Sequence, residues 1–189
     1  ALARACLERG AAVTLVSGPS YLSLDAWKEF SDLRVKNVVS CADMCAATVE
    51  AFDDADMAIL CAAVADFTPC DVADKKIKKQ PGQEGMVIPL KTTTDIAATL
   101  GGMKRVGSDK QVLVGFALET HDEEANAARK LQSKNLDMIV LNSLRDEGAG
   151  FGHDTNKVSF IDASHREELP LLSKAEVAER IADRIEKLL

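Results

Sequence analysis

The apolar residues of this chain fall in short runs that alternate with segments of helical spacing. Apolar runs of strand length occur at Met57–Leu60, at residues 111–116 and at residues 137–141. Because these runs are apolar at nearly every position, they are typical of strands buried on both faces of a parallel sheet. Two further strands are predicted at residues 12–16 and 33–39.

The segments between these runs predict helices, and some carry clear N-terminal signals. Ser40 with Asp43, and Ser173 with Glu176, have the spacing of capping boxes, and residues 120–123 form a third. The expected helices cover residues 1–9, 40–52, 94–102, 122–134 and 173–188. Strands that alternate with helices in this way predict an α/β fold, a three-layer sandwich with a mostly parallel sheet, similar to Rossmann and ribokinase-like architectures.

Two antiparallel hairpins interrupt this alternation. One closes the sheet at residues 157–161 and 168–171, and the other forms an arm from residues 72–79 and 86–91, joined by a turn. The arm carries four lysines within five positions: Lys75, Lys76, Lys78 and Lys79. An isolated two-stranded hairpin is marginal in water, so we expect a protruding β arm that packs against something else.

Length and composition fit one ordinary domain over residues 1–189, with 47% apolar residues. The formal charge of −7 argues against general nucleic-acid binding, although it leaves room for a local basic pocket. No apolar run approaches the ~20 residues of a membrane span, so we expect a cytoplasmic protein. The five cysteines lack the histidine partners of a zinc site, so no metal is expected on them.

Three parts of the chain could bind a phosphate-rich ligand. Asp66 follows the central apolar run, at the edge where open α/β sheets hold ligands, and Lys76 lies ten residues further on. Residues 94–97 begin a helix, with Thr94 as its expected cap, and the free backbone N–H groups there can hold phosphate oxygens. Lys130 and Lys134 lie four apart, and therefore on one helix face.

Each of these features can also have a purely structural role, and the chemistry of the residues alone does not decide between the two roles. Lysine clusters are usually solvated surface, and an aspartate in a first helical turn is usually only a cap. Phe116 ends its strand, where it could stack beside a base, but a phenylalanine in the core is the commoner use.

One combination of motifs resembles a known family. Ala62-Ala-Val-Ala-Asp66-Phe, followed by Lys76-Ile-Lys-Lys79, is similar to phosphopantothenoylcysteine synthetase, the ligase of coenzyme A synthesis. Further matches run in order along nearly the whole chain: Val13-Thr-Leu-Val-Ser-Gly-Pro19, Thr94-Asp-Ile96, Gly115-Phe-Ala-Leu-Glu-Thr120, Lys130-Leu-Gln-Ser-Lys134 and Gly150-Phe-Gly152. The combination is specific, although no single motif is.

The resemblance implies acyl activation. The carboxylate of 4′-phosphopantothenate attacks the α-phosphate of CTP, which gives an acyl-cytidylate and pyrophosphate, and the amine of L-cysteine then displaces the nucleotide. Lys76 is implied as the catalytic cation, with Mg²⁺ as a second positive charge. The implied nucleotide-binding residues are Ala62, Asp66, Lys76, Thr94, Asp95, Ile96, Ala97, Phe116, Lys130 and Lys134. No residue is expected to ligate a resident metal.

Two features depart from the family pattern. The chain begins inside a helix, so we expect a domain truncated at its N-terminus, without the first strand and the Gly-rich loop that binds phosphopantothenate. Thr93-Thr94 stands where the family usually has Asn-Pro. The resemblance also implies a homodimer in which the arm reaches across to the other subunit, and a flavin-dependent decarboxylase domain upstream. No flavin site is expected in these residues.

Two other functions remain alternatives at this point. Residues 7–16 are also typical of a Rossmann-type NAD(P)-dependent oxidoreductase entering its second strand. That strand ends in Ser17-Gly18, however, and not in the acidic residue that binds an NAD ribose, and Tyr21 has no lysine four residues on. The other alternative is a non-enzymatic, dimerising nucleotide-binding module whose lysine arm docks to an acidic partner.

Overall fold

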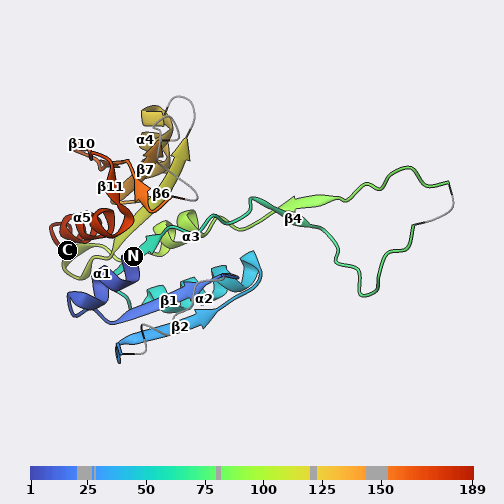
Figure 1. Ribbon diagram of the computed structural model, residues 1–189, viewed down its shortest axis with the longest axis horizontal. Helices are drawn as coiled ribbons and strands as arrows, with labels where there is room; N and C mark the ends of the chain where they lie inside the picture. Colours follow the sequence, from blue (N-terminus) through green and yellow to red (C-terminus); the bar gives the residue numbers. More distant parts are fainter. Residues whose placement is uncertain (21–26, 28, 80–81, 120–122, 144–152) are drawn as a thin grey trace.

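The computed structural model describes residues 1–20, 27, 29–79, 82–119, 123–143 and 153–189, and its body carries one long arm (Figure 1). The helices are α1 Leu2–Glu8, α2 Cys41–Asp53, α3 Ile96–Met103, α4 Glu123–Ser133 and α5 Lys174–Glu186. The strands are β1 Val13–Ser17, β2 Leu33–Asn37, β3 Met57–Leu60, β4 Phe67–Pro69, β5 Leu90–Thr92, β6 Val112–Glu119, β7 Met138–Ser143, β8 Thr155–Asn156, β9 Val158–Ile161, β10 Arg166–Glu168 and β11 Leu172–Ser173. None of the described helices is long and apolar enough to cross a membrane.

The central sheet has five strands in the order β10-β9-β7-β6-β3. β3, β6 and β7 run parallel, whereas β9 is antiparallel to β7 and β10 is antiparallel to β9. Parallel strands need helical crossovers, and a hairpin joins β9 to the edge strand β10, as the order of elements along the chain predicts. The second strand of this hairpin is Arg166–Glu168, and not the predicted residues 168–171. The expected α/β fold with a mostly parallel sheet is confirmed.

Apolar cores on both faces make this sheet the middle of three layers. On one face, Leu113 of β6 and Ile139 of β7 pack with Leu100 of α3, and α2 and α4 cover the same core. On the other face, Val140 of β7 packs with Ile181 of α5. Successive strand residues point to opposite faces, so the uninterrupted apolar runs of β6 and β7 fill both cores.

β1 and β2 form a separate parallel pair, which no hydrogen-bonded strand joins to the central sheet within the described residues. β3 is an edge strand of the central sheet, paired only with β6. The sequence predicts that Met57–Leu60 is buried on both faces, but its four residues are only half-buried. That prediction is wrong because β3 has a strand neighbour on one side only.

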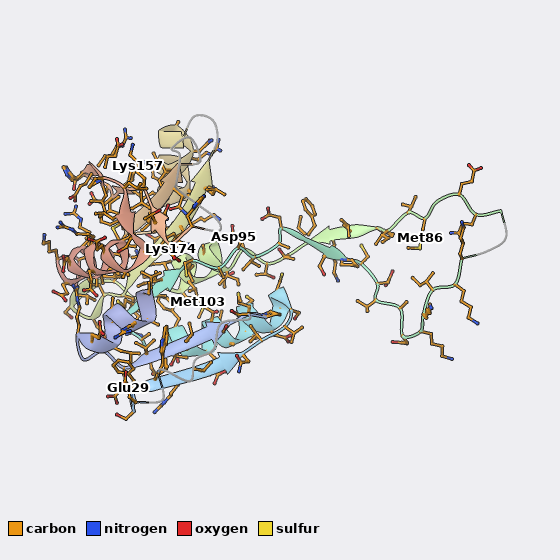
Figure 2. All side chains as sticks on the ribbon, viewed as in Figure 1. Glu29, Met86, Asp95, Met103, Lys157 and Lys174 are labelled. Atoms are coloured by element: carbon orange, nitrogen blue, oxygen red, sulfur yellow. The ribbon has the colours of Figure 1, made fainter. Side chains whose placement is uncertain are left out.

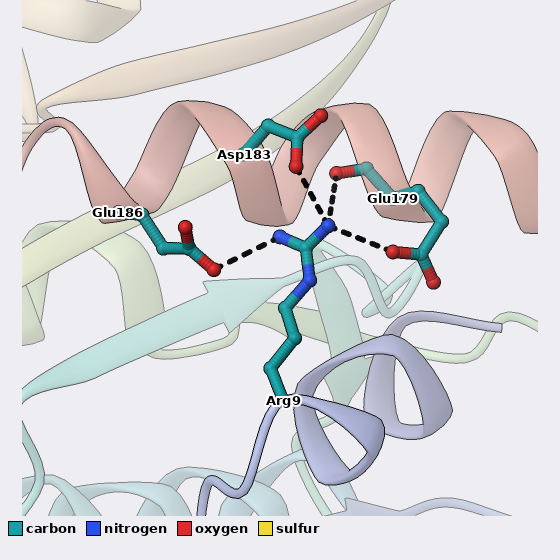
Figure 3. Close-up of polar contacts among 4 residues, drawn as sticks. All are labelled: Arg9, Glu179, Asp183 and Glu186. Carbon is teal, nitrogen blue, oxygen red and sulfur yellow. Dashed lines mark hydrogen bonds and ion pairs between the residues drawn. The ribbon is translucent and has the colours of Figure 1, made fainter.

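Arg9, which directly follows α1, ties the N-terminal helix to α5. Its guanidinium donates to Asp183 at 2.7 Å, to Glu179 at 2.8 Å and to Glu186 at 3.2 Å (Figure 3). The three carboxylates share one face of α5, because they are spaced four and three residues apart. Since α1 also contacts β1, these ion pairs link the β1–β2 pair to α5 through α1.

The capping boxes predicted for α2 and α5 are confirmed. The Ser40 hydroxyl accepts from the Asp43 N–H at 3.1 Å, and the Ser173 hydroxyl accepts from the Glu176 N–H at 3.2 Å. Each carboxylate in turn accepts from the N–H of its serine, which satisfies a second free donor of the helix end. The box predicted at residues 120–123 involves residues outside the described part of the chain.

The arm leaves the body after Asp66 and returns just before Asp95, and Met86 lies far along it (Figure 2). Among the described residues of the arm, strand pairing is confined to its base, where β4 runs antiparallel to β5 from Phe67↔Thr92 to Pro69↔Leu90. The predicted pairing of residues 72–79 with 86–91 is therefore wrong, although the protruding arm itself is present. Every residue from 70 to 79 is exposed, so no apolar face stabilises a longer ladder there.

Candidate functional site

The loop that follows β3 opens at the carboxyl edge of the central sheet and leads into the arm. Ala62 and Asp66 are both exposed in this loop. Thr93 fixes the loop to the returning arm: its N–H donates to the Asp66 carbonyl at 2.9 Å, and its hydroxyl donates to the Ala65 carbonyl at 2.7 Å. The Asp66 carboxylate has no hydrogen-bond or ion-pair partner in the described structure, so it is available to a ligand.

Helix α3 begins at the base of the arm, one residue later than predicted. Asp95, and not Thr94, is the N-cap, because the Asp95 carboxylate accepts from the Ala98 N–H at 3.0 Å. Thr94 is exposed, Ile96 is buried and Ala97 is half-buried. The first turn of a helix has backbone N–H groups that lack intrahelical acceptors, so this turn can donate to phosphate oxygens.

Lys134 brings a positive charge to the same turn. Its Nζ lies 2.8 Å from Oδ2 of Asp95. Burial by itself raises the pKa of the Asp95 carboxyl, but the hydrogen bonds from the Lys134 ammonium and the Ala98 N–H outweigh it, and the net pKa lies below its ordinary value. The ion pair is therefore intact at neutral pH, and two of the predicted nucleotide-binding residues are in direct contact.

Lys130 lies one helical turn before Lys134 and shares its face of α4. The Lys134 N–H donates to the Lys130 carbonyl at 3.0 Å, and both side chains are half-buried. α4 and α3 cover the same face of the sheet. The predicted set of Asp95, Ile96, Ala97, Lys130 and Lys134 therefore gathers on one layer of the fold.

Phe116 does not join that layer. It packs with the core under α5, and its register partner on β7 is Val140 of the same core. Its ring is half-buried on the opposite face of the sheet from Lys134. β6 continues to Glu119, so the prediction that Phe116 ends its strand is wrong. Phe116 can contact a ligand only if that ligand reaches over the carboxyl end of β6 to this face of the sheet.

Lys76 lies out on the arm, away from the other predicted residues. It is exposed, and a chain of ten residues from Asp66 can extend up to about 33 Å. In Figure 1 the arm projects away from the body along its whole length. Within one chain, the structure does not bring Lys76 to Asp95 or to Lys134.

A pair of amides at the end of β7, the half-buried Asn142 and the buried Asn156, has no simple signal in the sequence. The Asn156 Nδ2 donates to the Asn142 Oδ1 at 3.1 Å, and the Asn156 Oδ1 is buried without a hydrogen-bond partner. Asn142 follows Val140 by two positions, so both point to the sheet face that also carries Phe116. A buried amide oxygen without a donor is costly, so this place favours a ligand or water that can donate.

The hydrogen bonds that fix the backbone next to Lys134 are also not predicted by any pattern in the sequence. The Asn135 Nδ2 donates to the Gly101 carbonyl at 2.8 Å, and the buried Lys104 ammonium donates to the Asn135 carbonyl at 2.8 Å. The pair Gly101-Gly102 predicts only a helix end. A glycine just inside a helix is also a signal for close contact with another backbone.

The described residues contain no group of three or more histidine, cysteine, aspartate or glutamate side chains that could hold a metal. Asp95 is engaged by Lys134, which leaves Asp66 as a single free carboxylate in the loop. Mg²⁺ usually binds through one or two carboxylates together with substrate phosphates. Asp66 could therefore hold Mg²⁺ only together with phosphate oxygens of a bound ligand.

Comparison with known proteins places these features in a family. The family model described as "DNA/pantothenate metabolism flavoprotein C-terminal domain" matches residues 1–189. The chain belongs to this family. This confirms the resemblance to the synthetase half of the coenzyme A biosynthesis proteins.

Relatives of this DNA/pantothenate metabolism flavoprotein domain are longer than the chain itself. The chain is 47% identical over 189 residues to the coenzyme A biosynthesis bifunctional protein CoaBC of Bacillus subtilis, with 100% of the chain and 44% of that protein covered. It is 54% identical over 190 residues to a protein named cysteine/cysteine sulfinic acid decarboxylase from an unknown prokaryotic organism, with 100% of the chain and 50% of that protein covered. The chain thus spans about half the length of these curated relatives, whose names describe the whole proteins.

A solved structure supports both the family and the fold. The crystal structure of the C-terminal domain of a coenzyme A biosynthesis bifunctional protein CoaBC is 37% identical to this chain, with a TM-score of 0.76. The match covers 99% of this chain and 79% of that one.

Proposed function

We propose that this chain supplies the nucleotide-binding half of a ligase that joins 4′-phosphopantothenate to L-cysteine through an acyl-cytidylate made from CTP. The observation that carries the proposal is the junction of α3 and α4, where a helix N-terminus and two lysines share one layer. Membership in the pantothenate-metabolism family supports the choice of substrates.

Charge explains why this reaction needs such a site. A carboxylate and a triphosphate repel each other, so positive groups must stand where they meet. Lys130 and Lys134 hold the phosphates, together with the N–H groups of the first turn of α3 and the Mg²⁺ that the nucleotide brings. Asp66 and Ala62 line the loop in which the nucleoside lies, and Phe116 contacts it at the carboxyl edge of β6.

Lys76 acts on the site of a second copy of the chain. Since the arm points away from its own body, Lys76 reaches a nucleotide only across a homodimer. The exposed apolar side chains of the arm support this arrangement, because they gain burial against a second copy: Phe67, Val72, Ile77, Met86, Val87, Ile88 and Leu90. The lysine then neutralises phosphate charge while the bond between acyl oxygen and phosphorus forms.

The acyl substrate needs residues beyond this chain. The open edge of β3 and the separate β1–β2 pair support the proposal that a further parallel strand completes the sheet and brings a loop for phosphopantothenate. A flavin-dependent decarboxylase domain upstream and a cytoplasmic location belong to the same proposal. The flavoprotein description of the family and the decarboxylase among the relatives support the upstream domain. On this account, residues 1–189 bind nucleotide by themselves but do not ligate.

Ligand-dependent stability of the 189-residue chain tests the proposed site. CTP with Mg²⁺ should raise the unfolding temperature in proportion to the logarithm of its concentration, because it binds only the folded state. ATP with Mg²⁺ tests the choice of base, and NADH tests an oxidoreductase. Stabilisation by NADH without stabilisation by CTP would overturn the proposal, and no effect from any nucleotide would favour a docking module.

A further inference from the structure

The position of Lys134 depends on an unusual backbone conformation immediately after it. Lys134 directly follows the last residue of α4, and the next residue, Asn135, has a φ of 49°. It is the only non-glycine residue with a positive φ in the described part of the chain. Asparagine tolerates this left-handed conformation better than most residues, and it ends the helix sharply.

Asn135 is held there by α3. Its side-chain amide donates to the Gly101 carbonyl at 2.8 Å, and its own carbonyl accepts from the Lys104 ammonium at 2.8 Å. The same ammonium lies 2.9 Å from both carboxylate oxygens of Asp137, and only 7% of the Lys104 side chain is exposed. Hydrogen bonds to both the side chain and the carbonyl of Asn135 thus fix the turn that follows α4.

Gly101 lets the two backbones approach each other. A Cβ atom built on Gly101 would lie 1.9 Å from the carbonyl oxygen of Lys134 and 2.8 Å from its carbonyl carbon. Any side chain at position 101 would therefore push the main chain of Lys134 away. The backbone of Lys134 rests on the C-terminal half of α3, while its ammonium reaches the N-cap of the same helix, 2.8 Å from Asp95.

We infer that Asn135 and Gly101 are positioning residues for Lys134. They orient the Lys134 side chain along α3, so that its ammonium lies at the N-terminus of α3 before an anion binds. A nucleoside triphosphate then meets helix N–H groups and an ordered cation together, and the side chain has little rotamer freedom left to lose. This inference rests on the proposed nucleotide site and names the residues that arrange it.

A double-mutant cycle on CTP binding separates this role from a merely structural one. The measurement is the Kd of CTP with Mg²⁺ for the 189-residue chain, with unfolding temperatures recorded for every variant. Asn135→Ala should weaken binding about tenfold, the scale of one misplaced charge-assisted contact, and Lys134→Ala should weaken it at least as much. With Lys134→Ala already present, Asn135→Ala should add less than about twofold.

Three further variants make the test sharp. Asn135→Gly keeps the left-handed backbone but loses the bond to Gly101, so it should fold well and weaken CTP binding by a smaller factor. Gly101→Ala should weaken CTP binding as Asn135→Ala does. Gln132→Ala, which removes an exposed amide from another face of α4, is the matched control and should leave the Kd unchanged.

The outcomes test the positioning role of Asn135 and Gly101 separately from the proposed nucleotide site. If Lys134→Ala leaves the Kd unchanged, the proposed nucleotide site is wrong, and the inference falls with it. If Lys134→Ala weakens binding but Asn135→Ala has no effect, the positioning role alone is overturned. The same conclusion follows if Asn135→Ala costs as much without Lys134 as with it.

Discussion

The ammonium of Lys134 lies 2.8 Å from the carboxylate of Asp95, and the two residues that should meet a triphosphate neutralise each other in the free protein. An incoming phosphate must therefore share Lys134 with Asp95. Asp95→Asn should strengthen binding of inorganic tripolyphosphate by a few-fold, because it removes a nearby negative charge. Asparagine caps helices as well as aspartate does, so α3 should stay intact.

Calorimetric titration at two salt concentrations checks this prediction. The gain should shrink at higher salt, since part of it is a screened charge effect. Weaker binding by Asp95→Asn would mean that the carboxylate itself contacts the ligand or its magnesium.

Lys76 and Lys75 are adjacent on the arm, but the motif resemblance implies a role at the nucleotide for Lys76 alone. In a protein that joins this chain to the upstream half of the Bacillus subtilis relative, Lys76→Gln should lower the rate of acyl-cytidylate formation by ~10²–10³, the scale of one lost electrostatic contact. Lys75→Gln should have a mild effect. Equal small losses in rapid-quench measurements would show that the lysine cluster is only solvated surface.

The arm should carry the contact between two copies of the chain. Val87 is 90% exposed on the arm, and Val39 is 84% exposed on the body. We predict a dimer in analytical ultracentrifugation, which Val87→Ser weakens by several-fold in dissociation constant and Val39→Ser leaves unchanged. A monomer at high micromolar concentration, with the arm intact, contradicts the homodimer.

Asp162 should make the stability of the fold depend on pH in acid. Burial raises the pKa of its carboxyl, but the Arg184 guanidinium and the Ser164 N–H and hydroxyl outweigh it and lower the pKa from 3.8 to about 2. Because the folded pKa is depressed, the stabilisation is complete above about pH 4 and is lost as pH falls towards 2. It amounts to about 2 kcal/mol.

Urea unfolding of wild type and Asp162→Asn between pH 2 and 5 measures this effect. The difference in unfolding free energy should be constant above pH 4 and shrink below it. Asp71→Asn, an exposed residue of the arm, is the control. A difference that stays constant down to pH 2 would show that Asp162 titrates normally.

Local signals in the sequence predict most of the fold because they act over a few residues. The boxes at Ser40 and Ser173 and the apolar runs of β6 and β7 depend on neighbours in the chain, and the structure has them where predicted. The half-burial of Met57–Leu60 was not predictable, since it depends on which strands lie beside β3.

In the candidate site, too, local sequence patterns predict some features, and others depend on how distant elements pack. The spacing of Lys130 and Lys134 predicts a shared helix face, and the structure shows it. The pairing of Lys134 with Asp95, the support from Asn135 and Gly101, and the side of the sheet that Phe116 faces all depend on how α3, α4 and β6 pack. Long-range packing of this kind leaves no periodic pattern in the sequence.

Formation of CMP that depends on phosphopantothenate is the decisive measurement of the proposed ligase activity. The protein is this chain joined to the upstream half of the Bacillus subtilis relative, with that relative as a positive control. With CTP, Mg²⁺, 4′-phosphopantothenate and L-cysteine, we predict equal amounts of CMP, pyrophosphate and phosphopantothenoylcysteine, and none of them when phosphopantothenate is left out. A folded protein that binds CTP, yet releases no CMP while the control turns over, would contradict the account.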